Sequence, residues 1–182
     1  IGVRGGIAGD ATVTRTAEDE FHVISSGMAE RYHKRFFDMV PLPEGAIFES
    51  LTDTVCGFNV AGPKSRELLQ RMTNASLATE DFPFMRSKRI QLAGIDVLAL
   101  RVSFTGDLGW ELHCDVADQL ALYTALIGAG RAFGAGPVGG RALMSLRVEK
   151  GYGSWSREYS PEYWPQEVGL DRLVKMDKDF LN

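Results

Sequence analysis

The sequence predicts an α+β fold with antiparallel or mixed sheets and packed helices. Short runs that alternate apolar and polar residues stand close together along the chain, as paired strands do. Helical patterns are scattered among them and do not alternate regularly with single strands, which disfavours a doubly wound parallel sheet. A glycine-rich nucleotide-binding loop of the dinucleotide or Walker type is also missing from the sequence.

Four elements are expected in the first third of the chain. Strands at 11–16 and 20–25 flank a polar turn, so they are expected to pair. A helix capped by Ser25 or Ser26 follows, and it must end before a Pro-Leu-Pro sequence, because proline interrupts helices. Residues 46–60 are rich in β-forming residues and predict further strand structure.

A hairpin and three helices are expected in the remainder. Proline at residue 63 suits the first turn of a helix. Two β runs at 88–92 and 95–102 meet at an Ala-Gly turn, which predicts a hairpin. Asp115 is expected to cap a helix, and another helix runs to about Glu149. The inward face of the helix after Asp115 is expected to be Val116, Leu120, Tyr123 and Ile127.

Composition narrows the class of protein. The chain has 182 residues, 45% of them hydrophobic, and a net charge of −4, which is typical of a globular domain. No basic block and no apolar run of about 18 residues occur, so neither nucleic acid nor a membrane is an expected partner. The first residue is Ile1 rather than methionine, so we interpret the chain as an internal piece of a longer protein. Sub-domains are expected at about 1–60 and 61–182.

Cysteines and histidines give little indication of a metal site. Cys56 and Cys114 are too few for a disulfide framework or a CxxC site, so two buried reduced thiols are expected. The three histidines, His22, His33 and His113, lack zinc-ligand spacing, so we interpret them as surface residues or core residues with satisfied hydrogen bonds.

Three segments combine turn glycines with isolated charged or aromatic residues. In the first, several glycines precede Asp10, and they would let the backbone approach a ligand; a plain glycine turn with a solvated aspartate fits as well. In the second, Glu111 should point away from the face that carries Trp110. A buried carboxylate there needs donors, such as the paired N–H groups of a pterin or guanine; an exposed edge-strand glutamate is the alternative.

The third segment starts at Arg147, near the end of the last predicted helix. Arg147 and Lys150 can stabilise the helix terminus or bind a ligand carboxylate. The aromatic residues that follow, including Tyr152 and Trp155, fit either core packing or a wall against a flat ring.

Four motifs occur in order along the chain: Gly5-Gly6-Ile7-x-x-Asp10, Val60-Ala61-Gly62-Pro63-Lys64-Ser65, Ser103-Phe104-Thr105-Gly106-Asp107-x-Gly109-Trp110-Glu111 and Leu146-Arg147-Val148-Glu149. Together they resemble the folate-binding aminomethyltransferase family, the family of the glycine cleavage T-protein, over nearly the whole chain. The Glu149-Lys150-Gly151-Tyr152 run with Trp155 resembles the C-terminal folate domain of dimethylglycine and sarcosine dehydrogenases. By this resemblance the chain would lack the family's first strands and its C-terminal β-barrel.

The resemblance implies a tetrahydrofolate-binding domain that captures an oxidised N-methyl group as 5,10-methylenetetrahydrofolate. The expected partners are folate, a one-carbon donor and a flavin domain of the parent chain, which would carry the FAD; no metal is expected. The bacterial cytoplasm or the mitochondrial matrix is the expected compartment. The implied residues are catalytic Asp10 and folate-binding Glu111, Phe104, Arg147, Tyr152 and Trp155.

Two alternatives stay open: a stand-alone aminomethyltransferase, and a non-catalytic folate-binding relative. The sequence also departs from the family's commonest motifs. Phe104 stands where many relatives have tyrosine, and Asp107 where many have glutamate. Gly9 replaces an acidic residue that is often present beside the acid at position 10.

Overall fold

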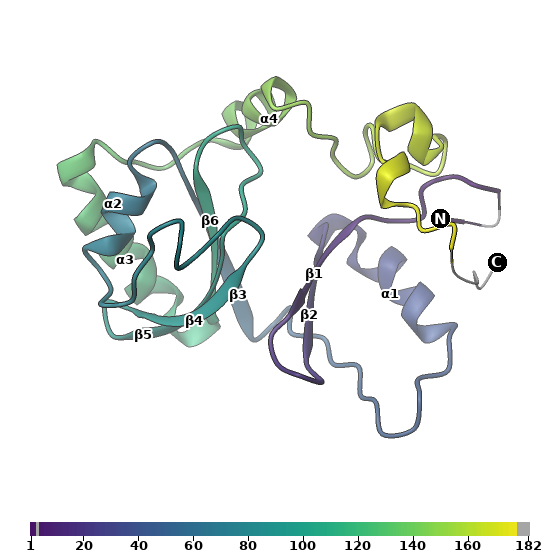
Figure 1. Cartoon of the computed structure of the whole chain (residues 1–182), viewed down its shortest axis with the longest axis horizontal. Coiled ribbons are helices and arrows are strands. Elements are labelled where there is room, and N and C mark those ends of the chain that lie inside the picture. Colours follow the sequence, from purple (N-terminus) through teal and green to yellow (C-terminus); the bar gives the residue numbers. More distant parts are fainter. Residues whose placement is uncertain (3, 178–182) are drawn as a thin grey trace. The chain divides into compact units, whose positions relative to one another are not determined.

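The computed structural model of the chain describes residues 1–2 and 4–177 (Figure 1). Packing divides the chain into two compact units. Unit 1 consists of Ile1–Ile47 and Gly153–Asn182, and unit 2 of Phe48–Tyr152. The sub-domains expected at about 1–60 and 61–182 stay a prediction. Units 1 and 2 have different bounds from these, because unit 1 combines both ends of the chain.

The described residues of unit 1 form one hairpin and one α-helix. Strands β1 (Ala11–Arg15) and β2 (Phe21–Ser25) pair antiparallel, as expected from their alternation. Helix α1 spans Glu30–Asp38 and begins later than predicted, because Gly27–Ala29 forms a 3₁₀ turn and Ser26 makes no side-chain cap. Short 3₁₀ turns at Pro165–Val168 and Asp171–Leu173 end the described part of the unit.

Unit 2 is built around a four-stranded antiparallel sheet. The strand order is β3-β6-β5-β4, so β6 is a central strand and β3 lies at one edge. Figure 1 shows helices α2 and α3 beside each other next to this sheet, and α2 contacts both α3 and β6. The predicted α+β class with antiparallel sheets is confirmed. The elements are β3 (Val55–Ala61), α2 (Ser65–Gln70), β4 (Ser87–Leu92), β5 (Ile95–Leu100), β6 (Gly109–Asp115), α3 (Gln119–Gly130) and α4 (Gly140–Glu149).

The main core lies between this sheet and the helices α2 and α3. Alternate residues of β6 face it, and Trp110 and Leu112 are almost fully buried there. The Phe82 ring meets the Trp110 ring edge-on, with their centroids 5.1 Å apart. Leu69 of α2 and Leu122 of α3 complete the contact from the helix side. This packing orients β6 and thereby fixes which face each of its side chains occupies.

Two predictions about unit 2 are wrong. Residues 46–54 form no strand, and β3 begins only at Val55. The buried positions of α3 are Leu122 and Leu126, whereas Leu120 is 75% exposed. This helix carries apolar residues on nearly every side, so periodicity alone does not select the buried face. Asp115 caps the 3₁₀ turn Val116–Asp118 that precedes α3, since its Oδ1 accepts a hydrogen bond of 2.8 Å from the backbone N–H of Ala117. The α-helix itself begins later than predicted and has no side-chain cap.

In the described part of the chain, no helix combines the length and the apolar character that crossing a membrane requires.

Candidate functional site

Asp10 lies immediately before β1 in unit 1, and its carboxyl group is partly withdrawn from water. Its Oδ1 atom is buried and has no hydrogen-bond partner among the described residues. Burial raises the pKa of this carboxyl group above its ordinary value, while the charge of His33 and a backbone hydrogen bond act in the opposite direction. A carboxyl group with a raised pKa is suited to both accepting and donating protons.

His33 of α1 is the residue that organises the surroundings of Asp10. Its ring is 7% exposed, and its Nδ1 lies 3.2 Å from the Ser25 hydroxyl of β2. The Trp155 ring meets the imidazole edge-on, with centroids 4.5 Å apart. The pKa of His33 is lowered by burial, and the charge of Asp10 offsets only part of this decrease. The structure therefore connects two predicted site residues, Asp10 and Trp155, through a histidine that sequence reasoning set aside.

Glu111 lies on β6, on the face opposite the main core. It alternates with the buried Trp110 and Leu112, so the predicted orientation is confirmed. The edge-strand interpretation is wrong, because β6 pairs with β3 on one side and β5 on the other. Its side chain is 22% exposed, and its Oε2 lies 3.7 Å from Nε2 of His113. A half-buried carboxylate on a central strand offers two oxygens in a fixed orientation.

Phe104 and Tyr152, two predicted folate-binding residues, lie together in unit 2. Their rings meet edge-on with centroids 5.6 Å apart. The Lys150 ammonium lies 4.6 Å from the centre of the Tyr152 ring and donates a hydrogen bond to the Ser103 carbonyl. Burial lowers the pKa of Lys150. Lys150 thus joins the end of α4 to the loop before β6, and it holds the aromatic pair in place.

Arg147 has a structural role at the end of α4. Its side chain is buried, and Nη1 donates a 2.9 Å hydrogen bond to the Tyr152 carbonyl. The backbone N–H of Tyr152 donates in return to the Arg147 carbonyl at 2.9 Å. Gly151 between them has φ +75°, which glycine adopts without strain. A role for Arg147 in binding a ligand carboxylate stays a prediction.

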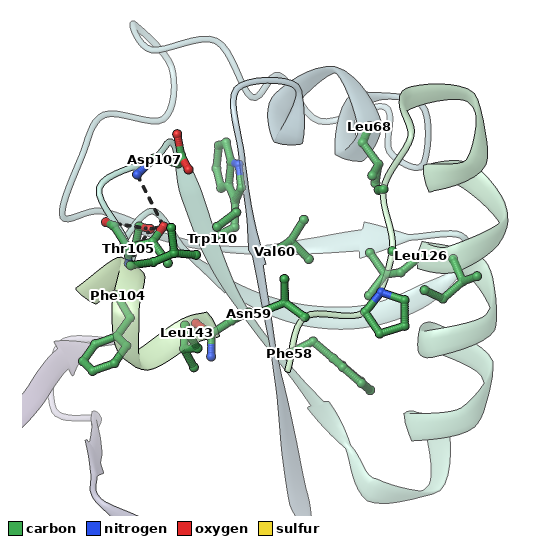
Figure 2. Close-up of a pocket in the computed structure, with 18 of the residues that line it drawn as sticks. Phe58, Asn59, Val60, Leu68, Phe104, Thr105, Asp107, Trp110, Leu126 and Leu143 are labelled. Carbon is green, nitrogen blue, oxygen red and sulfur yellow. Dashed lines mark hydrogen bonds between the residues drawn. The ribbon is translucent and has the colours of Figure 1, made fainter. Parts of the chain in front are cut away.

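A cavity of about 300 Å³ lies in unit 2 between β3, α3, α4 and the loop that carries Phe104 (Figure 2). Most of its lining is apolar. Thr105 is buried in the loop, and its hydroxyl lies 3.1 Å from that of Ser103. Trp110 lines the cavity, whereas Glu111 points to the other face of the strand and does not. The labelled lining residues in Figure 2 include Phe58, Asn59, Val60, Leu68, Leu126 and Leu143.

The sequence did not indicate that His33 lies beside Trp155, nor that Lys150 contacts the Ser103 carbonyl and the Tyr152 ring. The spacing of Ala29 and His33, four residues apart and both buried, is the one sequence signal that would have placed His33 on the inward face. Across the described ranges 1–2 and 4–177, no cluster of three or more histidine, cysteine or acidic side chains is arranged to hold a metal ion.

Comparison with known proteins gives the family. A family model described as "GCVT N-terminal domain" matches residues 2–178. Human mitochondrial dimethylglycine dehydrogenase is 34% identical over 182 residues, which is 98% of this chain and 21% of that protein. Mouse mitochondrial sarcosine dehydrogenase is 35% identical over 188 residues, which cover 95% of this chain and 20% of that protein. An aminomethyltransferase of Thermoanaerobacter sp. (strain X514) is 30% identical over 175 residues, which cover 96% of this chain and 47% of that protein.

A solved structure shares the fold. The heterotetrameric sarcosine oxidase of Corynebacterium sp. U-96, in complex with pyrrole 2-carboxylate, superposes with a TM-score of 0.56 at 22% identity. The match covers 74% of this chain and 66% of that one. The chain spans about a fifth of the length of the dehydrogenases and about half of the aminomethyltransferase. The match over residues 2–178 and these relatives show that the chain belongs to the GCVT N-terminal domain family, as an aminomethyltransferase-type domain.

Proposed function

We propose that the chain is the tetrahydrofolate-binding, one-carbon transfer domain of a flavin-dependent N-methyl amine dehydrogenase. In this role it captures an oxidised N-methyl group as 5,10-methylenetetrahydrofolate. The observation that carries the proposal is the Asp10 carboxyl group, which has a buried oxygen without a hydrogen-bond partner in the described structure, in a chain of aminomethyltransferase type. Transfer of carbon to an amine requires proton transfer, and such a carboxyl group can provide it.

The residues present fit a folate. A pterin presents an N–H beside an amino group, and these two parallel donors match the two oxygens of one carboxylate. Glu111 offers such a carboxylate, half-buried on a central strand where its direction is fixed. The facing rings of Phe104 and Tyr152 offer aromatic surface for the flat parts of the ligand. Trp155 offers the same kind of surface beside His33 in unit 1.

When bound, tetrahydrofolate supplies nucleophilic amine nitrogens that combine with an electrophilic one-carbon unit. Two N–H protons leave those nitrogens in the overall reaction; one goes to the departing amine nitrogen and the other is released. In its charged form Asp10 accepts a proton, and in its neutral form it returns one. Because burial raises the pKa of Asp10, both forms are accessible at a smaller cost than for a fully solvated aspartate.

The parent enzyme and its compartment are part of the proposal. Since the chain spans about a fifth of the dimethylglycine and sarcosine dehydrogenases, a flavin domain on the same polypeptide would generate the one-carbon unit and carry the FAD. Those relatives are named as mitochondrial, which supports the matrix for a eukaryotic parent and the cytoplasm for a bacterial one. Neither nucleic acid nor a membrane is a proposed partner.

A stand-alone aminomethyltransferase is the second candidate function. It is favoured by the 30% identity to the Thermoanaerobacter protein, of which the chain covers 47%. Both candidates use the same folate site and the same proton-transferring carboxylate, and they differ in the donor of the carbon. A donor that arrives on a carrier protein supports the aminomethyltransferase, whereas one delivered by a flavin domain of the same polypeptide supports the dehydrogenase.

Calorimetric titration with tetrahydrofolate under reducing conditions tests the proposal. Glu111→Ala should bind about 30-fold more weakly or worse, because the loss of a paired, charged contact costs roughly 2–4 kcal/mol. Asp96→Asn is a matched control, since Asp96 is an exposed carboxylate on a neighbouring strand of the same sheet. Its affinity should equal that of the unmodified chain.

Formation of methylenetetrahydrofolate from formaldehyde provides the second readout. Asp10→Asn should lower the catalysed rate by about 100-fold or more while leaving folate affinity within a few fold. Folate binding that survives Glu111→Ala unchanged would remove the pterin role of Glu111. A folded chain that shows no folate binding, even when extended at both ends, would overturn the proposed function.

A further inference from the structure

His33 and Asp10 place two complementary buried atoms in the same part of unit 1. Nε2 of His33 and Oδ1 of Asp10 are both buried, and neither has a hydrogen-bond partner among the described residues. A buried polar atom without a hydrogen-bond partner has lost its bonds to water and gained none in exchange. Such atoms are rare in folded proteins, so each one requires an explanation. The two atoms do not bond to each other, but one is an acceptor and the other is a ring nitrogen that can donate, and the charges of the two groups act on each other.

The position of the imidazole is determined on three sides. Nδ1 is held at 3.2 Å by the Ser25 hydroxyl, which leaves Nε2 as the ring nitrogen available for another group. The Trp155 ring supports the imidazole from the side. The backbone at Gly9 lies against its Nε2 edge, because a Cβ at position 9 would be 2.9 Å from both Nε2 and Cδ2. Asp10 follows Gly9 directly in the sequence, so its backbone lies next to this contact.

Gly9 therefore has a specific reason to be glycine. Its side-chain space is taken by the His33 ring, and an acidic residue at position 9 would displace that ring. The chain thus combines a single acid in this turn with a buried imidazole behind it.

We propose that His33 is a positioning residue for Asp10: the imidazole orients the carboxyl group and exchanges a proton with it during one-carbon transfer. The proton moves between Oδ1 and Nε2 through one bridging water, because the two atoms are not hydrogen-bonded to each other. No bond to carbon is involved, and the balance of atoms is unchanged. His33 keeps Asp10 charged when a proton must be accepted. The role of the proton rests on the proposed function, whereas the coupling of the two groups can be measured without folate.

The charged and titratable groups around the pair are few. The charge of His33 lowers the pKa of Asp10, and the charge of Asp10 raises the pKa of His33. Tyr32 of α1 contributes an aromatic edge 5.7 Å from the imidazole, and the Arg35 guanidinium lies 4.0 Å from the centre of the Tyr32 ring. Ser25 and Trp155 carry no charge. The informative measurement is therefore the effect that Asp10 and His33 each have on the pKa of the other.

Nuclear magnetic resonance titration of the 182-residue chain, without folate, tests the coupling. The Asp10 carboxyl is followed in the unmodified chain and in His33→Gln, and the His33 imidazole in the unmodified chain and in Asp10→Asn. We expect the pKa of Asp10 to rise in His33→Gln and the pKa of His33 to fall in Asp10→Asn, because each substitution removes the charge that acts on the other group.

A purely structural role for His33 would not move the two titrations in these opposite directions. His22→Gln is the control, because His22 lies in the neighbouring hairpin, and it should leave the titration of Asp10 unchanged. The Asp10→Asn measurement leaves the buried histidine in place, so it tests the proposal even if His33→Gln fails to fold. Titrations that do not move, or that move in the other direction, would overturn the proposal.

The catalytic readout separates this proposal from the proposed function. With formaldehyde and tetrahydrofolate, His33→Gln should lower kcat and move the alkaline-side pH profile upward while KM for folate stays unchanged. If both titrations move in the expected directions in a chain that binds no folate, the coupling of Asp10 and His33 stands and only the folate reaction is rejected. A lower kcat with an unshifted pH profile would reject the proton exchange.

Discussion

The Sγ atoms of Cys56 and Cys114 lie 3.4 Å apart across β3 and β6, where the two residues are directly opposite each other. Both thiols are free; Cys114 is buried as expected, whereas Cys56 is only half-buried. Burial and the neighbouring Cys56 raise the pKa of Cys114 from 9.0 to about 12. The two side chains form a small contact between the edge strand and the centre of the sheet.

The Cys114 thiol predicts a loss of stability in alkaline solution. Between pH 9 and about 12 the folded chain keeps a proton that the unfolded chain releases, so the free energy of unfolding falls as the pH rises through this range. Below pH 9 the thiol contributes no pH dependence. Urea unfolding from pH 8 to 10.5 should show a steeper decline in the unmodified chain than in Cys114→Ala. Parallel declines would contradict the raised pKa.

The contact between Gly9 and His33 predicts a strong energetic coupling. Gly9→Ala should lower the free energy of unfolding by about 1–3 kcal/mol, because the new Cβ overlaps a ring held by Ser25 and Trp155. The same substitution should cost much less in a His33→Ala background. Urea unfolding of the four variants measures the coupling.

Gly27→Ala serves as the control for this cycle, since a Cβ at Gly27 meets no atom within 4 Å. It should be close to neutral. Additive effects of Gly9→Ala and His33→Ala would mean that the two residues do not contact each other in solution.

The fold class was predictable because the strands alternate in the pattern that antiparallel pairing requires, and the direction of Glu111 followed from the same alternation. The buried face of α3 was not predictable, because that helix is apolar nearly all round. The position of His33 was not predictable either. It depends on the approach of the Gly9 backbone to a helix that starts some twenty residues later, and no local pattern encodes such a contact.

Phe82 should be among the most costly core positions. Its ring is fully buried against Trp110, so Phe82→Ala should lower the free energy of unfolding by about 3–5 kcal/mol through lost contacts and a residual cavity. Phe84, two residues along, is 62% exposed, and Phe84→Ala should change stability by less than about 1 kcal/mol. Thermal or urea unfolding measures both. Similar losses for the two variants would contradict the described core.

Arg147 should matter to the stability of the turn after α4. Arg147→Lys should lower the free energy of unfolding by about 1–3 kcal/mol, because lysine cannot reproduce the hydrogen bond of the buried guanidinium to the Tyr152 carbonyl. Arg141→Lys, at an exposed position of the same helix, is the control and should be neutral. A variant that unfolds like the unmodified chain, yet binds folate more weakly, would assign Arg147 to the ligand instead.

The pairing of both ends of the chain in unit 1 sets an order of folding during synthesis. The backbone N–H of Ile7 donates to the carbonyl of Tyr163 at 3.0 Å, and Gly6 lies so close to Pro161 that a Cβ would be 2.2 Å from its carbonyl oxygen. The ribosome releases every residue of unit 2 before it releases Pro161 and Tyr163. The four-stranded sheet can therefore form first, while the segment before Asp10 is completed only after the residues that follow unit 2 have been synthesised.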